Sequence, residues 1–346
     1  MLSRARIWFG APPGTLSCRS WIPGPPGGEE IHRAGRKVLR YVLSVCAIIA
    51  INFALPRLMP GDPVMNLIGE DAMVTPAQLA EIRAKIGLDR PVTVQFASYI
   101  GDLLCGDLGY SFHLHGPVAG ILWSRMFWTL LFAGTAIILG ALIGIVVGAL
   151  SGWEPETRRS RAVTCAAMAV SCTPPYFLAM LFLAFFAFRL GLFPAKGYYD
   201  VLTAGSVVHH LLLPVAVLTL FAASRNLLVM RGSVVQEKNS HYALYARAKG
   251  LFGRQILFRH LLRNASLPVI TLVALDFGFI FSGALFIEIV FSLNGMGTLI
   301  YDAILARDYP LLQGAFLVIA LLVVTANIIA DLLYGALDPR VREGGI

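Results

Sequence analysis

The chain has 346 residues, of which 57% are hydrophobic and only 14% are charged, and its mean hydropathy is +0.72. Soluble domains are about 45–50% apolar and about 25% charged, so one soluble core of this length would not bury so much apolar side chain. A lipid bilayer does accept it, and the composition indicates an integral membrane protein. The net charge of +8 does not indicate a nucleic-acid partner, because the basic residues lie between apolar segments.

Six apolar segments are long enough to cross a bilayer as helices. A transmembrane helix needs about 20 apolar residues, each adding about 1.5 Å of rise. Polar backbone groups inside lipid must be paired within the segment, so we expect each segment to be one helix. The sequence therefore predicts an all-α polytopic membrane protein with about six transmembrane helices. The segments are residues 38–56, 126–150, 163–188, 211–230, 268–291 and 313–336.

Glycines in the second apolar segment have the spacing of a helix contact. Gly140, Gly144 and Gly148 follow one another at intervals of four residues. Small residues at this spacing let two membrane helices approach closely. Glycine is also generally frequent in membrane helices, so the pattern leaves both interpretations open.

Lys and Arg residues gather on one set of loops, and this orients the chain. Basic residues near the ends of transmembrane helices are retained in the cytoplasm. The opposite loops hold fewer basic residues over longer stretches of sequence. We therefore expect both termini to be cytoplasmic, in a multi-pass protein of the cytoplasmic (inner) membrane. The basic stretches are residues 33–40, 158–161, 231–263 and 340–342.

The spans divide the chain into four parts. Residues 1–35, rich in Pro, Gly and Arg, are predicted to form a disordered cytoplasmic tail. Residues 36–125 hold the first span and a small external subdomain. Residues 126–336 form a core domain of five spans, and residues 337–346 form a second cytoplasmic tail.

The external subdomain contains one clear helix signal. Thr75-Pro76-Ala77-Gln78 has the pattern of a capping box with proline at the first helical position. It predicts a helix over Pro76–Ile86 that ends at Gly87.

The loop over residues 231–266, between the fourth and fifth spans, is the largest on the cytoplasmic side. Asn239 or Ser240 can cap a helix that runs through His241–Lys249, and Gly250 is a natural terminator. A second amphipathic helix is expected over about Gly253–Arg263. Two short helices would therefore meet at a glycine, on the face with the densest positive charge.

The segment Tyr242–Leu251 within this loop resembles the coupling loop of ABC-importer permeases, and more narrowly that of the dipeptide/oligopeptide/nickel permease family. Further matches occur in the same order along the chain, and the resemblance covers about residues 37–342. The matching segments are Pro60–Pro63, Gly106–Gly109, Ser111-Phe112, Arg259-His260, Leu262–Ala265, Leu267-Pro268, Glu288, Val290–Ser292, Gly295, Gly297, Asp302–Ile304, Arg307–Pro310 and Leu337–Arg340.

This resemblance implies an importer subunit that moves with ATP hydrolysis on other chains. The implied partners are a second homologous permease, two ATP-binding subunits that hold ATP and Mg, and an external substrate-binding protein. Peptides are the implied substrate, with nickel or another small solute as the alternative. The residues implied to couple transport to the ATPase are Tyr245, Ala246, Arg247, Ala248, Lys249 and Gly250.

The chain itself contains no phosphate-binding glycine loop followed by Lys-Ser/Thr, so we expect no ATP site in it. No cofactor or catalytic residue is expected either. A basic loop that only sets orientation is the alternative to a coupling loop. An ATP-independent secondary transporter is the alternative from another class, and an intramembrane enzyme would need a reactive pair that the sequence does not show.

Polar residues inside the spans are candidates for function, because ionisable groups in lipid are costly. Asp276 lies roughly 12 Å into the fifth span at helical rise, where many relatives of the family have Gln. It is a candidate for the substrate pathway or a structural partner of Arg225 or Asn226. Glu288 and Asp331, nearer the span ends, are interpreted as structural or gating residues. The remaining polar candidates are Asn52 and Asn327.

Two smaller residue sets are interpreted as ordinary. The external histidines could suit a metal such as nickel, but they are far apart and no carboxylate motif joins them, which favours plain loop residues. The five cysteines form no zinc or redox motif and are predicted to be unpaired thiols. These sets are His113, His115, His209 and His210, and Cys18, Cys46, Cys105, Cys165 and Cys172.

Overall fold

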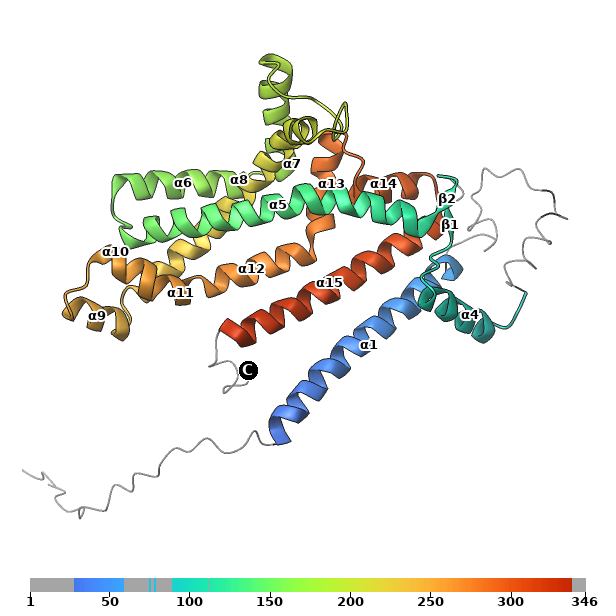
Figure 1. Ribbon diagram of the computed structural model, residues 1–346, viewed down its shortest axis with the longest axis horizontal. Helices are drawn as coiled ribbons and strands as arrows, with labels where there is room; N and C mark the ends of the chain where they lie inside the picture. The colour runs from blue at the N-terminus through green and yellow to red at the C-terminus, as the bar shows by residue number, and fades with distance from the viewer. Residues whose placement is uncertain (1–27, 59–74, 76–77, 79–88, 112, 338–346) are drawn as a thin grey trace, which may run out of the picture. The chain divides into compact units, whose positions relative to one another are not determined.

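The computed structural model describes residues 28–58, 75, 78, 89–111 and 113–337. The chain divides into two units, Met1–Leu43 and Ser44–Ile346, and all contacts given below lie within the second unit. The described residues are almost entirely helical, as predicted (Figure 1). The first elements are α1 (Gly28–Leu58), α4 (Val92–Leu104), β1 (Tyr110–Ser111), β2 (Gly116–Pro117), α5 (Val118–Trp153) and α6 (Arg158–Cys172).

The chain continues as a helical core. Its next elements are α7 (Pro175–Phe182), the π-helix η1 (Leu183–Arg189), α8 (Ala204–Glu237), α9 (His241–Ala248), α10 (Gly253–Gln255) and the π-helix η2 (Ile256–Leu261). The last are α11 (Leu262–Ala265), α12 (Leu267–Gly278), α13 (Ile280–Val290), α14 (Met296–Leu305) and α15 (Tyr309–Leu337). The two short strands pair antiparallel, with Tyr110 opposite Pro117.

Three described helices, α5, α8 and α15, are each long and apolar enough to cross a membrane. Two bent pairs of helices raise the number to as many as five if each pair forms one span. The apolar part of α1, Leu39–Ala54, is shorter than these. The six predicted segments therefore all lie in helices, but not all of them are single straight helices.

Two of the predicted spans are broken. The segment 163–188 bends by 102° between α6 and α7, at Pro174 and Pro175. Proline lacks the backbone N–H and its ring disfavours helical geometry in the preceding residue, so a continuous helix is not expected through this pair. The segment 268–291 is interrupted at Phe279, which has φ −104° and ψ 17°. The prediction of one continuous helix is wrong for these two segments.

The N-terminal tail is shorter than predicted, because α1 begins at Gly28 and includes residues 28–35. The predicted capping box is present: Thr75 N donates to Gln78 Oε1 at 2.9 Å and Gln78 N donates to Thr75 Oγ1 at 3.4 Å. Apart from Gln78, the predicted helix Pro76–Ile86 lies outside the described residues. So do residues 1–27 and 338–346 of the two tails.

Glycines hold α5 against α8. A Cβ at Gly140 would lie 2.6 Å from Ala222 Cβ, and one at Gly144 would lie 2.5 Å from Asn226 Cβ. Gly148 is equally crowded, by the carbonyl oxygen of Leu227 at 2.7 Å. The glycine repeat is therefore a helix interface, because only the absence of side chains permits this approach.

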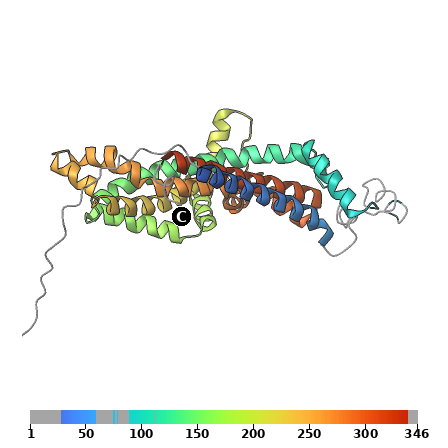
Figure 2. The ribbon, with the colours of Figure 1, turned by 90° about the horizontal axis from the view of Figure 1, so that it is seen from below.

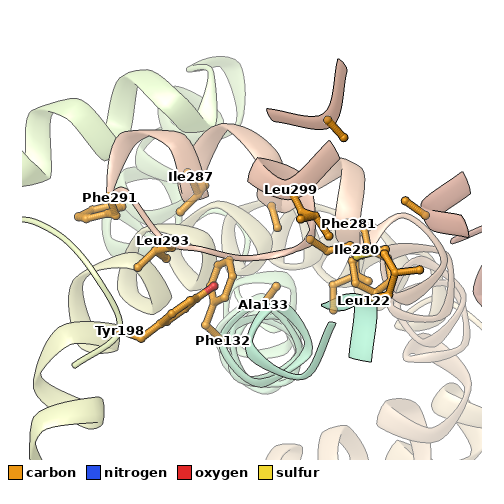
Figure 3. Close-up of a cluster of buried hydrophobic side chains, with 14 of the residues drawn as sticks. Leu122, Phe132, Ala133, Tyr198, Ile280, Phe281, Ile287, Phe291, Leu293 and Leu299 are labelled. Carbon is orange, nitrogen blue, oxygen red and sulfur yellow. The ribbon is translucent and has the colours of Figure 1, made fainter. Parts of the chain in front are cut away.

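A cluster of buried apolar residues joins α5 to α13 and α14 (Figure 3). Phe132 and Ala133 of α5 face Ile280 and Ile287 of α13, and Leu299 comes from α14. Other faces expose large apolar side chains, as on α5, where Trp123 is 70% exposed. Outward apolar surface of this kind suits lipid or a partner chain rather than water.

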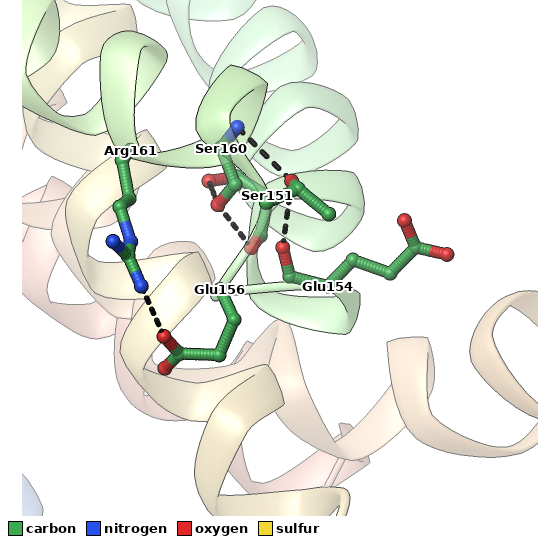
Figure 4. A network of polar contacts seen from close by, with 6 residues as sticks. Ser151, Glu154, Glu156, Ser160 and Arg161 are labelled. Carbon is green, nitrogen blue, oxygen red and sulfur yellow. Dashed lines mark hydrogen bonds and ion pairs between the residues drawn. The ribbon is translucent and has the colours of Figure 1, made fainter.

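The turn between α5 and α6 is fixed by hydroxyl groups (Figure 4). Thr157 caps α6 by accepting a hydrogen bond from Ser160 N at 3.2 Å. Ser160 Oγ donates to the carbonyl oxygen of Ser151 at 2.8 Å, which ties the start of α6 to the end of α5. The exposed pair Arg161–Glu156, at 2.5 Å, lies on the same turn.

Figures 1 and 2 place α9 near one end of α5 and the β1–β2 hairpin at its other end. The hairpin leads directly into α5 at Val118. The second unit therefore presents the coupling-loop residues at one end of its helices and the predicted external residues at the other.

Candidate functional site

The predicted coupling loop forms two short helical segments, as expected. Helix α9 begins after Ser240 and ends at Ala248, one residue earlier than predicted. The side chain of Ser240 makes no cap hydrogen bond, and its hydroxyl donates instead to the carbonyl oxygen of Glu237 at 2.7 Å. Gly250 follows with φ +76°, a left-handed conformation that L side chains rarely adopt. The glycine therefore reverses the chain toward α10.

The outer face of α9 and of the turn after it mixes apolar and basic side chains. Tyr245 is 64% exposed and Phe252 is 77% exposed. Lys249 Nζ lies 4.6 Å from the centroid of the Tyr245 ring, a cation–π contact that holds the lysine on this face. Arg247 and Ala248 are exposed as well. Five of the six predicted coupling residues thus lie on an open surface.

Ala246 is the exception, because it points into the protein. It is 6% exposed, and Ala243, one turn earlier, is fully buried. Both pack against Ile256 and Leu261 of η2. The small side chain of Ala246 therefore lets α9 lie close to η2 of its own chain.

Tyr242 anchors the start of α9. Its hydroxyl donates to Glu237 Oε2 at 2.5 Å. Partial burial, with the Glu237 hydrogen bond, raises the pKa of Tyr242 above its ordinary value.

Trp153, the last residue of α5, connects this loop to the spans. Lys238 Nζ lies 5.0 Å and Arg247 Cζ lies 5.7 Å from the centroid of its indole ring. A Cβ at Gly253 would be 3.0 Å from the same ring. Trp153 packs on both the α9–η2 cluster and the neighbouring cluster around Met230. Sequence analysis missed this residue, because nothing local distinguishes a tryptophan at a helix end.

Within the membrane region the structure pairs Asp276 with Arg225. Arg225 Nη2 contacts both carboxylate oxygens of Asp276, joining α8 to α12. The side chains are 39% and 18% exposed, respectively. Both line a cavity of about 320 Å³ between α5, α8 and the break that separates α12 from α13. Of the predicted alternatives, the structure shows Asp276 as a partner of Arg225, and its role in a substrate pathway stays a prediction.

The neighbouring candidate Asn226 does not join this pair. It is fully buried against Gly144, and within the described part of the chain its side-chain amide has no hydrogen-bond partner. Asn327 is partly buried on α15. Asp331 belongs to the same helix, but its side chain lies outside the described residues.

Glu288 is held in a closed polar cluster. It is fully buried, and its carboxylate accepts from Thr129 Oγ1 at 2.5 Å and from Thr298 N at 2.9 Å. Thr129 Oγ1 also accepts from Met296 N at 2.8 Å. A Cβ at Gly295 would lie 2.1 Å from Glu288 Oε1. These contacts tie α5, α13 and α14 together, which favours the structural interpretation of Glu288.

Hydrogen bonds also join two further pairs of segments that are distant in the sequence. Ser111 Oγ donates to the buried carboxylate of Asp308 at 2.5 Å, joining two segments that carry the family resemblance. Asn52 Nδ2 donates to the carbonyl oxygen of Gln313 at 2.9 Å, and Gln313 Nε2 returns a bond to the carbonyl oxygen of Asn52 at 3.0 Å. Asn52 therefore links α1 to α15.

The histidines and cysteines lie apart. His209 and His210 bond to backbone carbonyl oxygens, of Leu192 at 2.9 Å and of Ser206 at 2.8 Å. Across the described part of the chain, no group of three or more His, Cys, Asp or Glu side chains is placed to hold a metal ion. The four described cysteines, Cys46, Cys105, Cys165 and Cys172, are free thiols.

The fold defines a class of protein: a polytopic membrane protein with a helical loop between α8 and α12. Sequence comparison specifies the family. Residues 140–343 match the profile of the binding-protein-dependent transport system inner membrane component, and residues 34–133 match that of its N-terminal part. The chain belongs to this family of transport-system permeases.

Full-length relatives agree. A protein of Brucella ovis named as a peptide permease is 35% identical over 300 residues, covering 86% of this chain and 94% of the relative. One of Sinorhizobium fredii named as a peptide ABC transporter permease is 32% identical over 313 residues, covering 89% and 99%. The dipeptide transport system permease of Alkalihalophilus pseudofirmus is 30% identical over 330 residues, covering 89% and 98%.

Membership fixes the general role of the chain. It is a multi-pass subunit of the inner membrane that serves transport rather than catalysis, and ATP hydrolysis in these systems occurs on separate subunits. It assembles with ATP-binding and substrate-binding proteins.

Proposed function

We propose that this chain is one of two permease subunits of an ABC importer that moves peptides across the cytoplasmic membrane. A second, homologous permease completes the pathway, and two ATP-binding subunits hold ATP and Mg. An external substrate-binding protein delivers the peptide. The relatives are named as peptide or dipeptide permeases, and the similarity extends over nearly their whole length. These names support peptides as the substrate class.

The observation that carries the proposal is the exposed face of α9 and the turn after it. Tyr245 and Phe252 present apolar surface there, next to Arg247 and Lys249. Desolvated aromatic anchors beside basic groups suit a groove that is apolar inside and acidic at its rim. We therefore assign this face to the ATP-binding subunit, with both termini of the chain on the same, cytoplasmic side.

Transport then proceeds by alternating access. Closure of the ATP-binding subunits moves α9, and its packing on η2 and Trp153 passes the movement to α5 and α8. The substrate-binding protein acts at one end of these helices and the ATP-binding subunits act at the other. Substrate delivery and ATP binding therefore influence each other.

Peptide is proposed over nickel because the relatives are named as peptide or dipeptide permeases. Among the external histidines, His210 Nε2 lies 3.5 Å from Asp200 Oδ1, but in the described part of the chain no third His, Cys, Asp or Glu side chain joins this pair to hold a metal ion. The test uses the complete complex in proteoliposomes, with the binding protein outside and ATP inside. We expect uptake of labelled alanyl-alanine that needs both the binding protein and ATP. Uptake that persists without ATP would show a secondary transporter, and uptake of nickel but not peptide would refute the proposed substrate.

A further inference from the structure

The cavity beside the break between α12 and α13 has an unusual lining. It measures about 320 Å³, at the lower end of the range of about 300–1,000 Å³ for ligand pockets. Most of its walls are apolar side chains from α5, α7, α8 and α13, such as Ile137 and Phe221, and Gly283 of α13 also lines it. Arg225 and Asp276 are the charged residues in this lining.

The pair lies where a spanning segment is discontinuous. Asp276 is three residues before Phe279, the non-helical residue that separates α12 from α13. Arg225 approaches from α8, which has no such break, so one charge is on a discontinuous segment and the other on a continuous helix.

The contact with Asp276 uses only part of the hydrogen-bonding capacity of Arg225. Arg225 uses Nη2 for both carboxylate oxygens of Asp276, while its Nε is buried without a hydrogen-bond partner in the described residues. A guanidinium can hold a carboxylate through two parallel N–H groups, so Arg225 has donor capacity that Asp276 does not use. The pair is electrically neutral, which makes it tolerable inside the membrane.

We propose that Arg225 and Asp276 form a binding site for the two charged ends of a zwitterionic peptide. The peptide carboxylate pairs with Arg225 and the peptide ammonium pairs with Asp276, each replacing the other residue of the pair. The exchange keeps the net charge of the site at zero, so a peptide with both ends free enters without leaving a buried charge unpaired. This inference rests on the proposed function, since it concerns the same transported peptide.

The same argument makes the site selective. A peptide with an acetylated amine leaves Asp276 without its counterion, and an amidated peptide does the same to Arg225. A site built for hydrogen bonds to a charged group discriminates strongly against a substrate that lacks it, because its own groups then remain unpaired. The loss of one charge-assisted hydrogen bond corresponds to roughly a 10- to 100-fold slower transport.

The test measures import by the reconstituted complex for wild type, Arg225→Gln, Asp276→Asn and the double variant. Alanyl-alanine, its N-acetyl form and its C-amide are supplied at concentrations that saturate the binding protein. Wild type should import the free dipeptide about 10- to 100-fold faster than either blocked form. Asp276→Asn should shift preference toward the N-acetyl form, and Arg225→Gln toward the amide.

The double variant shows whether the Arg225–Asp276 pair binds the peptide or only stabilises the fold. Because it removes both charges together, it leaves neither unpaired, and co-purification with the ATP-binding subunits checks that it assembles. We expect its import of alanyl-alanine to stay about 10- to 100-fold below wild type. Wild-type import of alanyl-alanine by this variant would overturn the proposal. The exposed pair Arg161–Glu156, changed to Gln at both positions, is the matched control and should have no effect.

Failure of the proposed function has a different signature. In that case the wild-type complex would not import alanyl-alanine with ATP and binding protein present. The variants are compared only if the wild-type complex imports alanyl-alanine. A failure of the proposed function is therefore distinguished from a failure of the proposed binding site.

Discussion

At the scale of single residues, backbone conformation and close packing explain why particular side chains occur in the loops. Gly250 adopts φ +76° and has open space around it, so its requirement is conformational. Gly295 has the opposite constraint: its φ is negative, but Glu288 and Thr129 occupy the space of a side chain. Both glycines were identified from family resemblance, and the structure supplies a separate physical reason for each.

Replacement of Gly250 by Ala should weaken coupling without unfolding the spans. A non-glycine residue in the left-handed region costs roughly 1–2 kcal/mol, which is enough to tilt α9 away from its present position. We expect a several-fold loss of peptide-stimulated ATPase activity and of import in the reconstituted complex. Gly232→Ala is the matched control, because this glycine lies in α8 with open space and no positive φ. Equal activity of both variants would contradict the conformational role of Gly250.

Replacement of Gly295 by Ala should instead reduce stability. The new Cβ would meet the Glu288 carboxylate and Thr129 Oγ1 within about 2.5 Å, so this buried cluster must open. Overpacking and the loss of a hydrogen bond to a buried charge together cost about 3 kcal/mol or more. Thermal unfolding in detergent should show a clearly lower Tm. Gly101→Ala, in the open space of α4, should leave the Tm unchanged, and an unchanged Tm for Gly295→Ala would refute the cluster.

At the scale of elements, the side chain of Trp153 is one of the contacts between the end of α5 and the loop that joins α8 to α12. Trp153 contacts Lys238 at the end of α8, Arg247 of α9 and Gly253 of α10. It also packs in the cluster that includes Met230 and Val269. A displacement of α9 therefore reaches the end of α5 through direct side-chain contacts.

Trp153→Ala should separate ATP hydrolysis from transport. Its removal deletes two cation–π contacts and a packed ring, which cost roughly 3–5 kcal/mol in a well-packed site. We expect a complex that hydrolyses ATP but imports peptide at least about tenfold more slowly. Trp153→Phe keeps an aromatic face and should recover part of the import. The exposed Trp123→Ala is the control and should behave as wild type. Parallel loss of ATPase and import in Trp153→Ala would indicate lost assembly rather than lost coupling.

At the scale of the whole molecule, the functional features of the second unit lie at different positions along its helices. The coupling loop lies at one end of α5, and the β1–β2 hairpin with Asp308 lies at the other. The Arg225–Asp276 cavity lies between the two ends, where both charges are on spanning segments. This separation fits a path on which substrate arrives at one end and ATP acts at the other.

Thiol labelling tests the proposed orientation. Cys105 is an exposed free thiol between α4 and β1, so a membrane-impermeant maleimide should label it in spheroplasts. A Lys249→Cys substitution, in a background in which all five native cysteines are replaced by Ser, should react only after the membrane is permeabilised; the Cys105 label is read in a variant that keeps Cys105 alone. Labelling of the Lys249→Cys position in intact spheroplasts would invert the topology.

The sequence by itself determined the membrane class, the family and the short helix that ends before Gly250, because these depend on local properties. Apolar length, loop charge and short motifs are all readable along the chain. The glycine repeat left a helix interface and ordinary glycine enrichment both open, and the structure shows an interface with α8. The sequence could not show which face of α9 is open, so it did not distinguish the buried Ala246 from its exposed neighbours Tyr245 and Arg247.

Only the tertiary structure decided which polar side chains meet. Arg225 and Asp276 are 51 residues apart, Trp153 and Lys238 are 85 apart, and Thr129 and Glu288 are 159 apart. Such pairs depend on how each helix is rotated and where it crosses its neighbours, and no local pattern records this. The interruption at Phe279 belongs to the same group, since nothing in the apolar segment 268–291 marks the position at which its helix ends.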